Sequence, residues 1–204
     1  MKKIFIISLL MIFIISLNSC STKKFDISDK DNLYVQIVFK NGDKINLKLN
    51  YDAAPITVTN FVELASSSFY KNTILHRVIS DFMIQGGGYY LDNNDMPTLK
   101  KTDTIKGEFS ENGVNNNIKH ELGVISMARS NDYNSASSQF FICSATCNWL
   151  NGSYAAFGKT YDEKSNEVIL KISNTKTYYY SSLFTDYPVN PIIIKNIKLR
   201  NKAF

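Results

Sequence analysis

Alternation of apolar and polar residues is the clearest pattern in this chain, and it predicts β-strands. Residues 33–39 and 45–49 both alternate in this way, and Asn41-Gly42 separates them. A period of two is typical of a strand with one buried face, and an Asn-Gly pair between two such runs predicts a tight hairpin turn. Further short apolar runs predict strands at 74–78, 83–85, 124–127, 140–143, 155–159 and 192–199.

A spacing of three and four residues predicts two helices. It is seen in residues 58–65, just after Pro55, a residue common in the first helical turn, and a second helix is expected at 164–173. The polar residues 89–108 predict a loop. Many short strands with two helices indicate a mainly β fold, a closed antiparallel barrel capped by helices.

The first 20 residues are typical of an export signal. Lys2 and Lys3 precede an uncharged apolar run, residues 4–17, which is shorter than the roughly 20 residues that span a membrane. The run ends in Leu-Asn-Ser before Cys20, and this ending resembles the lipobox of bacterial lipoproteins. The resemblance implies cleavage before Cys20 and lipid attachment to its sulfur. An ordinary secretory signal or an uncleaved anchor are the alternatives.

This pattern divides the chain of 204 residues into three parts. We expect a signal peptide at residues 1–19, a lipidated cysteine with a polar tether at 20–30, and one domain at 31–204. The protein would then be extracytoplasmic and held on a membrane by its lipid.

Charge and cysteine content exclude several classes of function. The formal net charge is +5, or +3 without the leader, which is too small to indicate nucleic-acid binding. The two other cysteines, Cys143 and Cys147, cannot form a zinc site alone. They could pair as a disulfide, but we expect two free thiols, because Cys143 ends an apolar strand.

Residues 74–88 hold the most unusual combination of side chains. Arg77 is followed by the apolar Phe82 and Met83, then by Gln85 and three glycines. The segment offers no acid–base pair, metal-ligand spacing or nucleophile. An arginine against an apolar pocket suits a reaction that makes and breaks no bonds but needs one well-placed hydrogen-bond donor.

Together with residues 123–159, this segment closely resembles the cyclophilin family of peptidyl-prolyl cis–trans isomerases, and the resemblance extends over about residues 33–199. It implies an eight-stranded barrel with a helix over each end, no cofactor and no metal. It assigns catalytic roles to Arg77, Phe82 and Gln85. The positions that match substrate-binding residues are His76, Ile79, Met83, Ala128, Arg129, Gln139, Phe141, Trp149, Leu150 and Tyr154.

The chemistry of the X–Pro bond explains why such a site suffices. Resonance gives the amide a rotation barrier of about 18–20 kcal/mol. When the bond twists, the prolyl nitrogen becomes pyramidal and gains a lone pair. A donor aimed at this nitrogen binds the transition state better than either planar state, and arginine stays charged and offers a planar fork of donors.

Two positions depart from the vertebrate pattern of the family. Arg129 stands where asparagine is common, and Tyr154 where histidine is common. Trp149 occupies the position associated with cyclosporin binding. The departures affect inhibitor affinity and sequence preference more than the reaction, so cyclosporin-like inhibitors remain possible ligands.

Other interpretations stay open from the sequence. A lone arginine beside apolar residues is usually a surface residue, His76 and His120 are more typical of structural roles, and Trp149 could equally be core. The chain could be a proline-segment binding module or chaperone with little turnover, or an inactive scaffold.

The aromatic residues 174–190 lack a family counterpart and could pack over a barrel end or bind a client. We expect a monomer that acts on proline-containing polypeptides of exported proteins.

Overall fold

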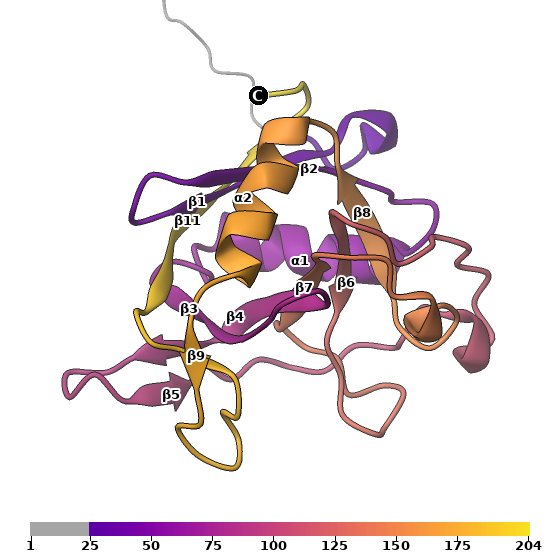
Figure 1. Cartoon of the computed structure of the whole chain (residues 1–204). Coiled ribbons are helices and arrows are strands. Elements are labelled where there is room, and N and C mark those ends of the chain that lie inside the picture. Colours follow the sequence, from indigo (N-terminus) through magenta and orange to yellow (C-terminus); the bar gives the residue numbers. More distant parts are fainter. Residues whose placement is uncertain (1–24) are drawn as a thin grey trace, which may run out of the picture.

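The computed structural model describes residues 25–204, which contain two α-helices and eleven strands (Figure 1). The helices are α1 (Pro55–Ser66) and α2 (Glu163–Ser173). The strands are β1 (Tyr34–Phe39), β2 (Lys44–Leu49), β3 (Thr73–Ile79), β4 (Met83–Leu91), β5 (Pro97–Leu99), β6 (Val124–Met127), β7 (Phe140–Cys143), β8 (Ala156–Thr160), β9 (Thr177–Tyr178), β10 (Tyr187–Pro188) and β11 (Ile192–Arg200).

The main sheet closes on itself. Its strands follow the order β3-β11-β1-β2-β8-β6-β7-β4-β5, and β4 also pairs with β3. This second pairing makes a ring of eight antiparallel strands, with β5 attached outside it to the end of β4. Closure leaves the ring without free edges. The predicted mainly β fold, a closed eight-stranded barrel with two helices, is confirmed.

Alternation along the strands directs apolar side chains into the barrel, as the sequence pattern predicts. Val35 and Ile37 of β1 lie opposite Leu47 and Ile45 of β2, and all four are fully buried. The hairpin between them turns at Gly42, whose φ of 93° is one that glycine adopts without steric cost.

Helix α1 contributes a large aromatic residue to the same core. The ring of Phe61 lies 5.1 Å from that of Tyr70, 5.7 Å from Phe140 and 5.2 Å from Phe157. Helix α2 adds Ile169 on its apolar face. Each helix therefore buries one face against the barrel, as its residue spacing predicts.

Carboxylates satisfy the first backbone N–H groups of both helices. The buried Glu108 accepts hydrogen bonds from the N–H groups of Ile56 (3.0 Å) and Thr57 (2.7 Å) at the start of α1. Asp162 caps α2 by accepting from the N–H of Ser165 at 2.8 Å. A negative group at a helix N-terminus also interacts favourably with the helix dipole.

The prediction of a loop at residues 89–108 is wrong for its first part. Strand β4 continues to Leu91 and pairs with β5, so that Tyr89 lies opposite Leu99 and Tyr90 opposite Thr98. This end of β4 pairs with β3 on one side, where Tyr90 lies opposite Thr73, and with β5 on the other, and its side chains are half-buried. Such a strand needs no continuous apolar run, and its sequence therefore resembles that of a loop.

Residues 174–190, here called the tyrosine-rich segment, form the small β9–β10 ladder. Phe184 and Tyr187 are buried against Ile74, whereas Tyr179 is exposed. Packing of these aromatic residues against the barrel, one of the two open interpretations, is confirmed for Phe184 and Tyr187.

The described part of the chain has no helix long and apolar enough to cross a membrane. Within residues 25–204, no group of three or more His, Cys, Asp or Glu side chains could hold a metal.

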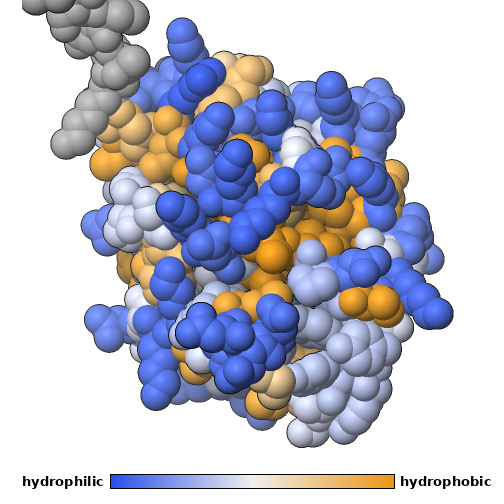
Figure 2. All heavy atoms as spheres, turned by 90° about the vertical axis from the view of Figure 1, so that its left-hand side faces the viewer, coloured by the Kyte–Doolittle hydropathy of each residue, from blue (hydrophilic) through white to orange (hydrophobic). Residues whose placement is uncertain are grey.

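Cys143 and Cys147 are buried free thiols, whereas Cys20 and the predicted signal peptide lie outside the described residues. On the face shown in Figure 2, apolar side chains gather near the middle and hydrophilic ones border them.

Candidate active site

A hollow of about 160 Å³ lies beside β3, β4 and β7. Every residue that lines it is one that the family resemblance picks out. The lining residues are Arg77, Phe82, Met83, Gln85, Ala128, Arg129, Phe141, Leu150 and Tyr154.

Strand register brings together the central residues of this hollow. Arg77 of β3 lies opposite Gln85 of β4, and Gln85 lies opposite Phe141 of β7. Residues directly opposite one another in antiparallel strands point to the same face. The donor, the amide and the aromatic wall therefore form one row across three strands, although Arg77 and Phe141 are far apart in sequence.

The wall and floor of the hollow are apolar. Met83, Phe141 and Leu150 are buried in one cluster, separate from the main core, and Ala128 and Tyr154 pack against it. The Tyr154 ring stands edge-on to Phe141 with centroids 5.7 Å apart. Such a surface suits the ring of a proline and excludes water from it.

His120 supports this wall from behind. Its ring stacks on Phe141, with centroids 5.9 Å apart and an interplanar angle of 18°. Its two ring nitrogens lie 3.1 Å from Asn151 Oδ1 and 3.1 Å from Ser126 Oγ. Burial lowers the pKa of His120, which favours a neutral ring. A structural role for His120 was the one expected from the sequence, but no motif linked this histidine to Phe141.

The polar side of the hollow holds two linked pairs of side chains. Gln85 Nε2 donates to Gln139 Oε1 at 3.2 Å. Arg77 Nε lies 3.5 Å from Asp186 Oδ2, and the Arg77 side chain is 40% exposed. Asp186 belongs to the tyrosine-rich segment, and nothing in the sequence identified it as part of the site.

Four predicted site residues do not line the hollow. Gln139 holds Gln85, as described, and Ile79 packs against the apolar cluster. Trp149 is 64% exposed and lies 5.7 Å from the Phe82 ring, at the rim, so the interpretation of Trp149 as core is wrong. His76 is only 4% exposed.

His76 faces the tyrosine-rich segment and not the hollow. Its ring lies 4.7 Å from Tyr89 and 6.0 Å from Phe184. Burial, together with the positive charge of Arg77, lowers the pKa of His76 to about 4, and the nearby Gln139 side chain opposes this shift. A neutral, enclosed ring fits the support role that the sequence allowed and leaves no surface for substrate contact.

Comparison with known proteins decides the family. The family described as cyclophilin type peptidyl-prolyl cis-trans isomerase/CLD matches residues 34–199. The chain belongs to this family.

Two curated peptidyl-prolyl cis-trans isomerases and a solved structure of a cyclophilin type isomerase agree with this result. Peptidyl-prolyl cis-trans isomerase A of Dickeya dadantii is 38% identical over 167 residues, 79% of this chain and 82% of the relative. An Acinetobacter baylyi peptidyl-prolyl cis-trans isomerase is 36% identical over 166 residues, with shares of 79% and 82%. A Cryptosporidium parvum cyclophilin type isomerase, solved in the presence of the dipeptide Ala-Pro, is 28% identical with a TM-score of 0.64, covering 82% of this chain and 98% of that one.

Arg129, one of the two departures from the vertebrate cyclophilin pattern, has a side-chain role in this chain. Its guanidinium carbon lies 4.7 Å from the Tyr154 ring, 4.9 Å from Tyr133 and 5.0 Å from Phe109. Its Nε also donates to the Ser153 carbonyl at 3.0 Å. Cation–π contacts of this kind stabilise ring positions, so Arg129 holds Tyr154 in the wall of the hollow.

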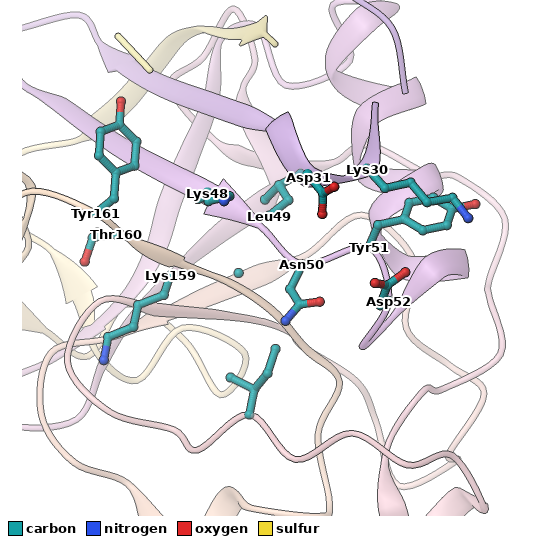
Figure 3. Close-up of a pocket in the computed structure, with 12 residues that line it drawn as sticks. Lys30, Asp31, Lys48, Leu49, Asn50, Tyr51, Asp52, Lys159, Thr160 and Tyr161 are labelled. Atoms are coloured by element: carbon teal, nitrogen blue, oxygen red, sulfur yellow. The ribbon is translucent and has the colours of Figure 1, made fainter. Parts of the chain in front are cut away.

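A second and larger hollow, of about 460 Å³, is lined by residues of β2, β8 and the turn Lys30–Asn32 (Figure 3). Two of its lysines have partners. Lys30 Nζ lies 4.6 Å from the centre of the Tyr51 ring, and Lys159 Nζ pairs with Glu121 at 2.9 Å. It contains none of the residues that the cyclophilin resemblance picks out.

Proposed function

We propose that this chain accelerates rotation about X–Pro bonds in exported polypeptides and that Arg77 is its catalytic donor. The observation that carries the proposal is the row of Arg77, Gln85 and Phe141 across three strands, which places a guanidinium at the edge of an apolar hollow. Membership in the cyclophilin-type isomerases supports the reaction class.

The residues of the hollow have separate roles in binding and catalysis. Met83, Phe141 and Leu150 bind the prolyl ring by apolar contact. As the amide twists, its resonance is lost and the prolyl nitrogen gains a lone pair, to which Arg77 donates a hydrogen bond. Because this bond is stronger in the twisted state than in either planar state, it lowers the barrier. No proton is transferred, so no acid or base is needed.

The amides keep the substrate backbone in place. Gln85 and Gln139 bind each other at 3.2 Å, which fixes the orientation of both side chains at the polar edge. Phe82 and Trp149 extend the apolar surface at the rim, with ring centroids 5.7 Å apart. The polypeptide on either side of the proline would lie along this rim.

The place of action is part of the proposal. The positive start, the short apolar run and the Leu-Asn-Ser-Cys20 ending support lipid attachment at Cys20 and a location outside the cytoplasm. Fatty-acid labelling in cells should mark the wild type and fail on Cys20→Ser. Equal labelling of both would exclude this anchor.

Turnover of a short X–Pro peptide, followed by protease coupling or by NMR exchange, tests the reaction itself. The wild type should catalyse the exchange and Arg77→Ala should lose most of this activity. Peptide binding without turnover by the wild type would instead indicate a proline-binding module. Titration of the same peptide into both proteins separates loss of binding from loss of catalysis.

A further inference from the structure

We propose that Asp186 is a positioning residue for Arg77, supplied by the tyrosine-rich segment. The inference rests on the proposed function, in which Arg77 is the catalytic donor. Asp186 does not line the hollow. It acts on the reaction through the arginine.

The contact itself is specific. Asp186 Oδ2 lies 3.5 Å from Arg77 Nε, and Thr185 Oγ1 donates to the same oxygen at 2.8 Å. Among the described residues 25–204, no other side chain forms a hydrogen bond or ion pair with Arg77. The Gln85 amide, which lies opposite Arg77 in the strand register, is hydrogen-bonded to Gln139.

The tyrosine-rich segment holds Asp186 firmly in this place. The N–H of Val78, the residue after Arg77, donates to the Asp186 carbonyl at 3.0 Å. On either side of Asp186, Phe184 and Tyr187 are 6% and 4% exposed and pack with Ile74. The carboxylate is therefore tied to the same strand as the arginine, and two buried rings prevent the backbone from moving away.

This geometry gives the carboxylate a defined task. An arginine side chain has about 2 kcal/mol of rotamer entropy, which an exposed side chain retains. A partner at Nε removes much of this freedom while it leaves the two terminal NH₂ groups unpaired. Those groups can then remain directed at the prolyl nitrogen, and a donor placed before the reaction is more effective than one that must be ordered during it.

The pair should affect turnover more than stability. Its side chains are 40% and 34% exposed, and ion pairs with this exposure contribute little to the free energy of unfolding. We expect Asp186→Ala to lower kcat by about 5- to 30-fold, the range that release of one ordered arginine can produce. KM should change by less than about twofold, because the apolar wall that binds proline is untouched.

Three further variants make the experiment decisive. Asp186→Asn keeps an oxygen acceptor for Nε and should lose less activity than Asp186→Ala. Asp95→Asn removes a carboxylate from the exposed turn between β4 and β5 and should turn over peptide at the wild-type rate. In an Arg77→Ala background, Asp186→Ala should cause no further loss, because a residue that acts through Arg77 cannot act without it.

The outcomes separate this inference from the proposed function. An inactive wild type, or an Arg77→Ala variant as fast as the wild type, overturns both. If Arg77→Ala is slow, the inference alone fails when Asp186→Ala matches or exceeds the wild-type rate, or when it slows the Arg77→Ala enzyme further. A kcat loss in Asp186→Ala that is smaller in Asp186→Asn and absent in Asp95→Asn supports it. Should Asp186→Ala fold poorly, Asp186→Asn takes its place. A kcat below that of the wild type supports the inference, and a wild-type kcat overturns it.

Discussion

At the scale of single residues, Arg77 combines two properties that rarely occur together. Its guanidinium is accessible enough to meet a substrate, yet it borders an apolar cluster built from Met83, Phe141 and Leu150. Electrostatic contacts are stronger where water is excluded. A single donor in this position can therefore act on a bond that has no formal charge.

The first prediction concerns this donor. Arg77→Ala should lower kcat and kcat/KM together, by roughly 100- to 1000-fold, because one well-aimed donor is lost from the transition state. Its melting temperature should stay close to that of the wild type, since the side chain is 40% exposed. Peptide turnover and thermal melting measure the two effects separately.

Arg77→Lys is the matched control. It keeps the positive charge but loses the planar fork of donors, so we expect it to remain strongly impaired. Turnover of X–Pro peptides by Arg77→Ala at the wild-type rate would show that the mechanism is wrong. A fully active Arg77→Lys would show that charge alone suffices.

Residue roles were predictable only where a motif carried them. All nine residues that line the hollow stand within two matched segments of sequence. Asp186 is 109 residues from Arg77 and lies in a segment without a family counterpart, so no local pattern could connect the two. The stacking of His120 on Phe141 was hidden for the same reason, because only the folded sheet brings the two rings together.

At the scale of elements, the close approach of β3 and β4 depends on glycine. A Cβ atom at Gly86 would lie 2.7 Å from the Ile74 carbonyl oxygen and 2.5 Å from Leu75 Cδ2. Gly86→Ala should therefore push the two strands apart and reduce the free energy of unfolding by about 1–3 kcal/mol. Because β3 carries Arg77, activity should also fall.

Urea unfolding of Gly86→Ala beside Gly42→Asn tests this effect. Gly42 has open space around it and a φ of 93°, and asparagine tolerates positive φ better than most residues. We expect the Gly42 variant to lose clearly less stability than Gly86→Ala. Equal losses would mean that the β3–β4 contact is not the critical feature.

Phe141 of β7 combines the roles of pocket wall and structural residue. Its ring is buried in the apolar cluster and packs between His120 and Tyr154. Phe141→Ala should cost about 3–5 kcal/mol of stability and should also raise KM for X–Pro peptides. Phe141→Leu retains much of the apolar volume and should lose less in both assays.

A Phe141→Ala protein with wild-type KM would remove Phe141 from the proline-binding wall. The contrast with Arg77→Ala is informative, because the arginine variant should be inactive but stable. Phe141→Ala should be impaired in both activity and stability.

Elements with one buried face were the ones that sequence periodicity could predict. Strands β1 and β2 and helix α1 each show the period of their own geometry, and their bounds lie within a few residues of those expected. Strand β5 and the β9–β10 ladder lie outside the ring, and the end of β4 that pairs with β5 is only half-buried, so side chains there alternate less clearly between core and water. Their polar and tyrosine-rich sequences show no regular alternation of apolar and polar residues from which a strand could be predicted.

At the scale of the whole molecule, barrel closure joins parts that are distant in the chain. Tyr34 of β1 lies opposite Arg200 of β11, and the β3–β4 pairing completes the ring. Periodicity identifies strands but carries no information on such pairings, so the eight-stranded closure was expected from the family resemblance and the order of the strands was not predicted. The ring in turn makes the active-site hollow possible, because it places β3, β4 and β7 side by side.

Burial of His76 makes the stability of the whole domain depend on pH. The pKa of this ring is lowered from 6.5 to about 4 in the folded protein, chiefly by burial. Above pH 6.5 the ring is neutral in both states. Between pH 6.5 and about 4, the unfolded chain takes up a proton that the folded protein excludes, so the free energy of unfolding falls as the pH falls. The loss should reach about 3 kcal/mol and level off below pH 4.

His76→Gln should flatten this part of the stability profile, because glutamine does not titrate. The pKa values of His120, Asp43 and Glu121 are also lowered in the folded protein. Their protonation therefore also lowers the free energy of unfolding as the pH falls, and the stability of His76→Gln should keep a residual dependence on pH. Urea unfolding of both proteins at pH 7, 6, 5 and 4.5 isolates the contribution of His76 as the difference between the two curves. Since His76 is packed against the tyrosine-rich segment, the same titration should loosen that segment first. Parallel curves for the wild type and His76→Gln would mean that His76 binds its proton equally well in the folded and unfolded states.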